Sequence, residues 1–248
     1  MDGTLIALFL IATFLGGLTS GLTGFAAGLV VSGIWLHIIT PLQTAVLIAA
    51  YGVINQGYGI WKVRHALVWR RILPFVVGGA IGVPLGVYLL TYLNPAHLRV
   101  GVGILLIAYS SYNLARPSIP PIKSNPPTDF GVGILNGLLG GLTGLGGVVS
   151  TIWCQLGGGS KDTQRALFQP VLFFTMTMTT GTFAASGHLF NAETMTLFFE
   201  GLPVLLIGLW VGVSLYGKLS DAAFRKAILV LLLVSGFSLV VPTSLFSG

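Results

Sequence analysis

The sequence predicts an all-α polytopic membrane protein with two inverted repeats, each a glycine-broken re-entrant hairpin plus about three transmembrane helices. Three observations predict it. Of 248 residues, 54% are hydrophobic and only 7% are charged, whereas soluble domains carry about 25% charged residues. A glycine-rich phrase occurs once in each half of the chain. The Lys and Arg residues fall almost entirely on one side of a membrane if the second phrase marks a hairpin.

Eight apolar stretches follow one another, over residues 4–39, 43–61, 72–91, 98–115, 130–157, 166–186, 195–216 and 223–241. Most have roughly the 20 residues that a transmembrane helix needs. The first and the fifth are longer, and each contains the glycine phrase. Residues 17–25 read GLTSGLTGF and residues 137–145 read GLLGGLTGL.

The polar linker over residues 116–129 contains five prolines and separates the two halves. Such a segment cannot continue a helix and suits an extended connector. It divides one membrane domain into a first repeat, 1–115, and a second repeat, 130–248. Matches at Gln43 and Gln164, at Gly86 and Gly212, and between residues 93–99 and 219–225 keep nearly constant spacing, which indicates an internal duplication.

The distribution of basic residues favours a hairpin in the fifth stretch. If all eight stretches cross the membrane, the 12 Lys and Arg residues divide six against six. If the fifth stretch enters and leaves on the cytoplasmic side, they divide eleven against one, with only Arg99 outside. The positive-inside rule prefers the second arrangement. The duplication extends the hairpin to residues 4–39, with both termini outside, but a broken spanning helix there remains an alternative.

The hairpin tips are the predicted binding site. Glycine lets the backbone approach a ligand closely, and the start of a returning half-helix presents N–H groups and positive dipole charge to an anion. Threonine hydroxyls would add donors. The candidate residues are Gly21, Thr23 and Gly24 in the first tip and Gly141, Thr143, Gly144 and Gly146 in the second. The alternative is that these glycines only allow close helix packing.

Polar residues in the apolar stretches are further candidates, because burying them in lipid is costly. Gln43 and Gln164 begin the stretch after each hairpin, and Arg165 could meet an anion from the cytoplasm or simply lie at the interface. Glu200 could couple transport to protons or lie in water at the outer interface. The remaining polar positions of the second and sixth stretches are Asn55, Gln56, Gln169 and the threonines 175, 177, 179 and 180. Those threonines could line a polar path or bond to their own helix.

Enzyme, metal and nucleic-acid functions find no support. The chain has one cysteine, Cys154, and no histidine pair at metal-ligand spacing, so we expect no metal and no cofactor. No P-loop phrase, nucleophile elbow or pair of carboxylates is present, so we expect no enzyme. The net charge of +6 is scattered between apolar stretches rather than gathered in a run with aromatics, which argues against nucleic acid as a partner.

The glycine phrases and the eight-stretch layout resemble the TauE/SafE sulfite exporter family. The resemblance rests on GLTGLGG at residues 141–147 and on the weaker GLTGFAAG at residues 21–28. It implies a multi-pass permease of the bacterial inner (plasma) membrane for sulfite, sulfonates or related organosulfur or carboxylate anions. The first phrase departs from the pattern, with Phe25, Ala26 and Ala27 where the second has Leu145, Gly146 and Gly147.

The function that follows is secondary transport of a small anion by alternating access. The alternatives are an anion channel and a membrane-embedded scaffold or assembly protein without a solute path. The expected partners are the small anionic substrate and the lipid bilayer, with a homodimer left open.

Overall fold

The computed structural model describes residues 3–90, 95–115, 122–143, 146–185 and 191–240, and these residues form helices and no strand. The all-α prediction is therefore confirmed. The elements are α1 (Gly3–Thr23), α2 (Ala27–Ile38), α3 (Pro41–Val63), the 3-10 turn η1 (Arg64–Ala66), α4 (Trp69–Leu90), α5 (Pro95–Ala115), α6 (Pro126–Thr143), α7 (Val148–Gly157), α8 (Lys161–Ala185), α9 (Ala192–Tyr216) and α10 (Asp221–Val240).

Each long apolar stretch contains two helices, α1 and α2 in the first and α6 and α7 in the fifth. In the first, the Trp35 indole of α2 stacks on Phe9 of α1 with ring centroids 5.0 Å apart, so α2 folds back along α1. In the fifth, Trp153 Nε1 of α7 donates to Asp129 Oδ1 near the start of α6, at 2.9 Å. With 12 and 10 residues, α2 and α7 rise about 18 and 15 Å, roughly half of a bilayer's hydrocarbon core of about 30 Å.

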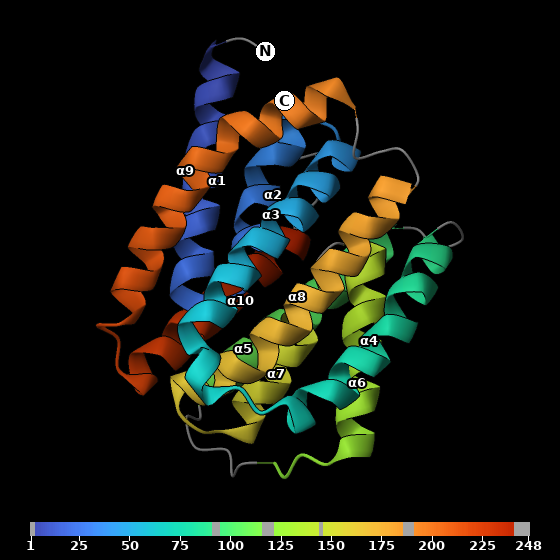
Figure 1. Cartoon of the computed structure of the whole chain (residues 1–248), viewed down its shortest axis with the longest axis vertical. Coiled ribbons are helices and arrows are strands. Elements are labelled where there is room, and N and C mark those ends of the chain that lie inside the picture. Colours follow the sequence, from blue (N-terminus) through green and yellow to red (C-terminus); the bar gives the residue numbers. More distant parts are fainter. Residues whose placement is uncertain (1–2, 91–94, 116–121, 144–145, 186–190, 241–248) are drawn as a thin grey trace.

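The helices pair across the two halves (Figure 1). The pairs are α1 with α9, α4 with α6, α3 with α8, and α5 with α10. If the first five α-helices are exchanged in order with the last five, α1 against α9 becomes α6 against α4, and the other two pairs map onto themselves. The pairing is thus the same from either half of the chain.

Glycine faces build the α1–α9 and α4–α6 pairs. A Cβ added at Gly21 would lie 2.5 Å from the carbonyl oxygen of Leu209, and one at Gly212 would lie 2.9 Å from the Gly21 Cα. In the other pair, a Cβ at Gly137 would lie 2.6 Å from the Gly79 carbonyl oxygen. Small residues four apart let helix backbones meet in this way, as they commonly do in membranes. Close helix packing, the alternative to a role in anion binding, therefore accounts for glycines of the repeated phrase such as Gly21 and Gly137.

Several basic residues lie at helix junctions at one end of the bundle. Figure 1 shows the junctions from α3 to α4, from α7 to α8 and from α9 to α10 at its lower end, whereas α1 begins and α8 ends at the upper end. The basic residues of those lower junctions are Lys62, Arg64, Arg70, Arg71, Lys161 and Lys218.

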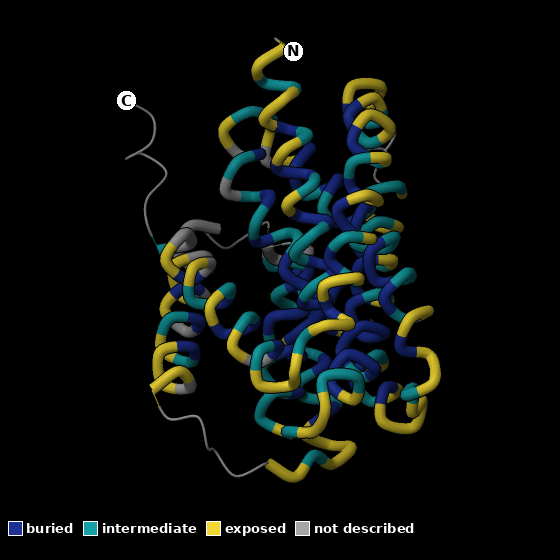
Figure 2. Tube along the Cα trace, turned by 90° about the vertical axis from the view of Figure 1, so that its left-hand side faces the viewer, coloured by how far each residue is buried: buried dark blue, intermediate teal, exposed yellow. Residues whose placement is uncertain are grey.

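The outer surface of the bundle is apolar. Trp210 is 64% exposed and Phe199 is 63% exposed, both on α9, while the buried residues lie along the middle of the molecule (Figure 2). Among the described residues, two helices are by themselves long and apolar enough to cross a membrane, Gly3–Thr23 and Ala192–Tyr216. This distribution of exposed apolar side chains suits contact with lipid rather than water.

Candidate functional site

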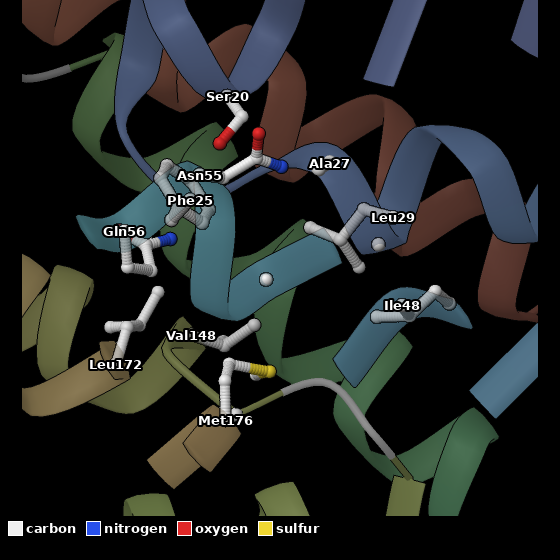
Figure 3. Close-up of a pocket in the computed structure, with 13 residues that line it drawn as sticks. Ser20, Phe25, Ala27, Leu29, Ile48, Asn55, Gln56, Val148, Leu172 and Met176 are labelled. Carbon is white, nitrogen blue, oxygen red and sulfur yellow. The ribbon is translucent and has the colours of Figure 1, made fainter. Parts of the chain in front are cut away.

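A small cavity lies where the two helix breaks meet α3 and α8 (Figure 3). Its volume is about 30 Å³. Residues of the first break, Gly146 of the second and residues of both long helices line it. Its polar side chains are Ser20, Asn55 and Gln56. The site is therefore small, central and free of charged side chains in its lining.

Residues of the first break form part of the wall of this cavity. The chain turns at Gly24, whose φ of +91° favours glycine. Helix α2 then begins after Ala26, which makes no side-chain capping bond. Ala27, Gly28 and Leu29, the first residues of α2, line the cavity. Because the first N–H groups of a helix have no partner within it, they and the helix dipole suit an anion.

The amide of Asn55 on α3 is buried in the cavity wall without a partner. Asn55 is 2% exposed, and neither its Nδ2 nor its Oδ1 bonds to any described residue. Figure 3 shows the side chains of Asn55 and Ser20 pointing toward one another. A buried amide without hydrogen bonds costs roughly 1–3 kcal/mol for each unsatisfied group. Such a group at a cavity is what a polar ligand would satisfy.

Gln56, the next residue on α3, ties this helix to the first break. Its Nε2 donates to the carbonyl oxygen of Gly24 at 2.9 Å. Its Oε1 is buried and has no partner among the described residues. Gln56 therefore holds the turn that starts α2 and presents an acceptor as well.

The N–H groups at the second break already bond to a side chain of the protein. The chain turns at Gly147 with a φ of +116°, and Asn136 Oδ1 of α6 accepts from the N–H groups of Gly147 at 2.9 Å and Ser150 at 3.3 Å. Asn136 thus caps the start of α7. Gly16, just before the first glycine phrase, stands at the position that matches Asn136, so α1 has no side chain there that could cap α2 in the same way.

Arg165 braces the first break from α8. It is 2% exposed, and its guanidinium donates to the carbonyl oxygen of Gly21 at 3.0 Å. The guanidinium also lies 4.1 Å from the ring centroid of Tyr216 at the end of α9. The Tyr216 hydroxyl donates to Asp162. Arg165 therefore links α8, α9 and the end of α1, beside the cavity rather than in its lining.

The predicted site residues are thus only partly brought together. Gly146 lines the cavity, and Gly24 forms the turn beside it. Gly21 packs on α9. Gly141 lies against Gly86 of α4, since a Cβ added at Gly86 would be 3.1 Å from the Gly141 Cα. Gly144 and the side chain of Thr143 lie outside the described residues.

The remaining predicted residues lie away from the cavity lining. Gln43 forms a capping box with Thr40 at the start of α3, and Gln164 Nε2 donates to the carbonyl oxygen of Gly159 just before α8, at 3.1 Å. Glu200 is exposed on α9. Sequence reasoning missed Asn136, because its contact with the start of α7 joins two helices and no local sequence pattern signals it.

Four of the predicted threonines bond to their own helices, whereas Thr180 Oγ1 is buried and bonds to no described residue. Thr23 Oγ1 donates to the Thr19 carbonyl oxygen at 2.8 Å, and Thr175, Thr177 and Thr179 each donate to the carbonyl four residues earlier. The hydroxyl of Thr23 is thereby occupied. For these four threonines the structure therefore shows hydrogen bonds to their own helix rather than hydroxyls free to line a polar path.

Replacing Gly147 by alanine should destabilise the second break. An alanine there would adopt a backbone conformation that costs on the order of 1–3 kcal/mol, and its Cβ would lie 2.6 Å from Leu172 Cδ2. The matched control is Gly157→Ala at the other end of α7, where a Cβ meets nothing within 4 Å. Thermal unfolding in detergent should show a lower midpoint for Gly147→Ala alone. Equal midpoints for the two variants would contradict this view of the turn.

Comparison with known proteins gives one match. The family model described as "Sulfite exporter TauE/SafE" matches residues 9–239. No curated protein and no solved structure matches the chain. The matched region includes both helix breaks, the cavity and all but the ends of the outer helices. The chain belongs to the TauE/SafE sulfite exporter family of integral membrane transporters.

Proposed function

We propose that the protein is a secondary transporter that moves a small sulfur oxyanion or a related sulfonate or carboxylate across the bacterial inner membrane by alternating access. The observation that carries the proposal is the cavity where the uncapped start of α2 meets the unpartnered amide of Asn55. Backbone N–H groups, a positive helix end and a buried amide donor together suit one small anion.

The helix pairs support a topology of two inverted repeats. In this proposal α1 with α2 and α6 with α7 are re-entrant hairpins that open to opposite sides. The short α2 and α7 reach only to mid-membrane, where irregular backbone is tolerated if it lines a protein-enclosed cavity. The basic residues at one end of the bundle then lie in the cytoplasm, and both termini lie outside.

The two breaks play unequal roles in binding. The first supplies open N–H groups, whereas Asn136 already accepts from the second at Gly147 and Ser150. The second break therefore contributes shape, through Gly146 and Val148 in the cavity wall. Alternating access would proceed by movement of the glycine-packed pairs, α1 with α9 and α4 with α6, about this fixed site.

Arg165 is proposed as the residue that receives the anion from the cytoplasmic side. Its Nε is buried and bonds to no described residue. Arg165→Met should reduce transport about tenfold, because a hydrogen bond to a charged group contributes roughly 1.5–3 kcal/mol. The exposed Arg71 provides the control, Arg71→Met. If both variants transport anions at the rate of the unaltered protein, Arg165 has no part in the path.

Flux of radiolabelled sulfite in proteoliposomes tests the proposed function. A transporter should give saturable flux above that of protein-free liposomes, with methanesulfonate and small carboxylates tested beside sulfite. Flux that rises without saturation would indicate an anion channel. If no anion crosses faster than in protein-free liposomes, the protein is a membrane scaffold and the proposal is wrong.

A further inference from the structure

The cavity presents hydrogen-bond acceptors as well as donors. Asn55 contributes an unpartnered Nδ2 donor and an unpartnered Oδ1 acceptor, and Gln56 contributes an unpartnered Oε1 acceptor. Both side chains are nearly inaccessible to solvent, at 2% and 3% exposure. A site for an anion whose oxygens only accept hydrogen bonds would need donors alone. These acceptors instead suit a ligand that has a hydrogen-bond donor of its own.

The orientation of Gln56 is fixed by the protein. Its Nε2 is committed to the carbonyl oxygen of Gly24 at 2.9 Å, and that carbonyl belongs to the turn before α2. Rotating the amide would set its oxygen against a carbonyl oxygen, which repels it. The acceptor Oε1 is therefore held in the cavity wall whatever the ligand. Asn55, which has no bond to either end of its amide, can turn to offer its Nδ2.

An anion without an O–H or N–H group leaves the Gln56 Oε1 acceptor without a hydrogen bond. Its oxygens can accept from the N–H groups at the start of α2 and from Asn55, but Gln56 Oε1 then faces negative charge without a partner. A monoanion that carries its own O–H or N–H satisfies both kinds of group at once. Sites that bury a group meant for a substrate O–H or N–H reject the analogue lacking it, because the protein group is left unpaired.

We infer that the cavity selects a small monoanion that itself carries a hydrogen-bond donor, such as a protonated oxyanion, over an anion whose oxygens only accept. The donor of the ligand bonds to Gln56 Oε1, and its negative oxygens accept from the start of α2 and from Asn55 Nδ2. This inference rests on the proposed transport function and specifies the chemical form of the substrate. For sulfite, the form taken is the hydrogen-bearing monoanion.

Sulfamate and methanesulfonate form a matched pair of probes. Both are monoanions with three oxygens on sulfur, and they differ by an amino group in place of a methyl group. Each is added to the purified protein in detergent, and the rise of its unfolding midpoint with anion concentration gives an apparent affinity. Each is also tested as an inhibitor of labelled sulfite flux in proteoliposomes. Sulfamate should bind and inhibit at least about tenfold more tightly than methanesulfonate.

Two variants assign the preference to Gln56. Gln56→Met should bring the two apparent affinities together, whereas Gln155→Met, which alters an amide on α7 outside the cavity lining, should keep them apart. If Gln56→Met does not fold, the comparison on the unaltered protein still decides. Equal affinities of the unaltered protein for the two probes would overturn the inference, because a bound water would then satisfy the acceptor. The proposed transport function would stand in that case. Absence of both flux and stabilisation by any anion would overturn the proposed function itself.

Discussion

Replacing Asn55 by leucine should strongly reduce anion transport and, at the same time, make the protein more stable. The amide is buried without a partner, so an apolar side chain of similar size removes an unsatisfied donor and acceptor. Relief of each unsatisfied group should raise the free energy of unfolding by about 1–3 kcal/mol. The same change deletes a donor to the anion, and we expect sulfite flux to fall roughly ten- to a hundredfold.

Asn136→Leu is the matched control for this result. Asn136 is also a fully buried asparagine, but its Oδ1 accepts from Gly147 and Ser150. Its loss should lower the unfolding midpoint, because capping bonds contribute about 0.5–2 kcal/mol. Thermal unfolding in detergent and proteoliposome flux are measured on both variants. If Asn55→Leu is destabilised like Asn136→Leu, or transports sulfite normally, the amide of Asn55 is structural and the site lies elsewhere.

The second large effect is expected at the α4–α6 pair, where Gly137→Leu should prevent stable folding. A Cβ at Gly137 would lie 2.6 Å from the carbonyl oxygen of Gly79 and 2.9 Å from its Cα, so the clash is with backbone and cannot be relieved by a rotamer. The two helices would have to separate along their glycine faces. We expect a loss of at least about 3 kcal/mol, in the range of severe core overpacking.

Gly131→Leu on the same helix serves as the control, since a Cβ there meets nothing within 4 Å. Both exchanges of glycine for leucine raise helix propensity by the same amount. The comparison therefore isolates the effect of the clash between α6 and α4. Yield of monodisperse protein and the unfolding midpoint report the outcome. Comparable yield and midpoint for the two variants would show that α4 and α6 do not meet at this face.

Much of the fold is predictable from the sequence because it follows from local pattern. The glycine phrases predict hairpin tips over residues 21–24 and 141–146, and the structure turns at Gly24 within the first and at Gly147 just after the second. The roles of individual glycines are not predictable in this way. Gly21 and Gly24 stand three positions apart in one phrase, yet Gly21 packs on α9 and Gly24 turns the chain, because only the tertiary arrangement decides which face meets a neighbour.

The site is less predictable for the same reason. Gln43 and Gln164 match across the repeat because both lie in the first turn or so of a helix, where Gln43 completes a capping box and Gln164 donates to the carbonyl oxygen of Gly159. Asn55 is one of several polar residues in apolar sequence, and only the packing of α3 against the first break leaves its amide without a partner. The capping of the second break depends on Asn136, a contact between helices that local pattern does not encode.

The most direct test of the central claim, that an anion binds between the start of α2 and Asn55, is a crystal structure with selenite. Selenite resembles sulfite in shape and charge, and its selenium atom gives an anomalous signal that identifies it. The account predicts an anomalous peak in the cavity, with oxygens within hydrogen-bond distance of Asn55 and of the first N–H groups of α2, and no such peak in Asn55→Leu. A peak elsewhere in the bundle, or an unchanged peak in Asn55→Leu, would contradict it.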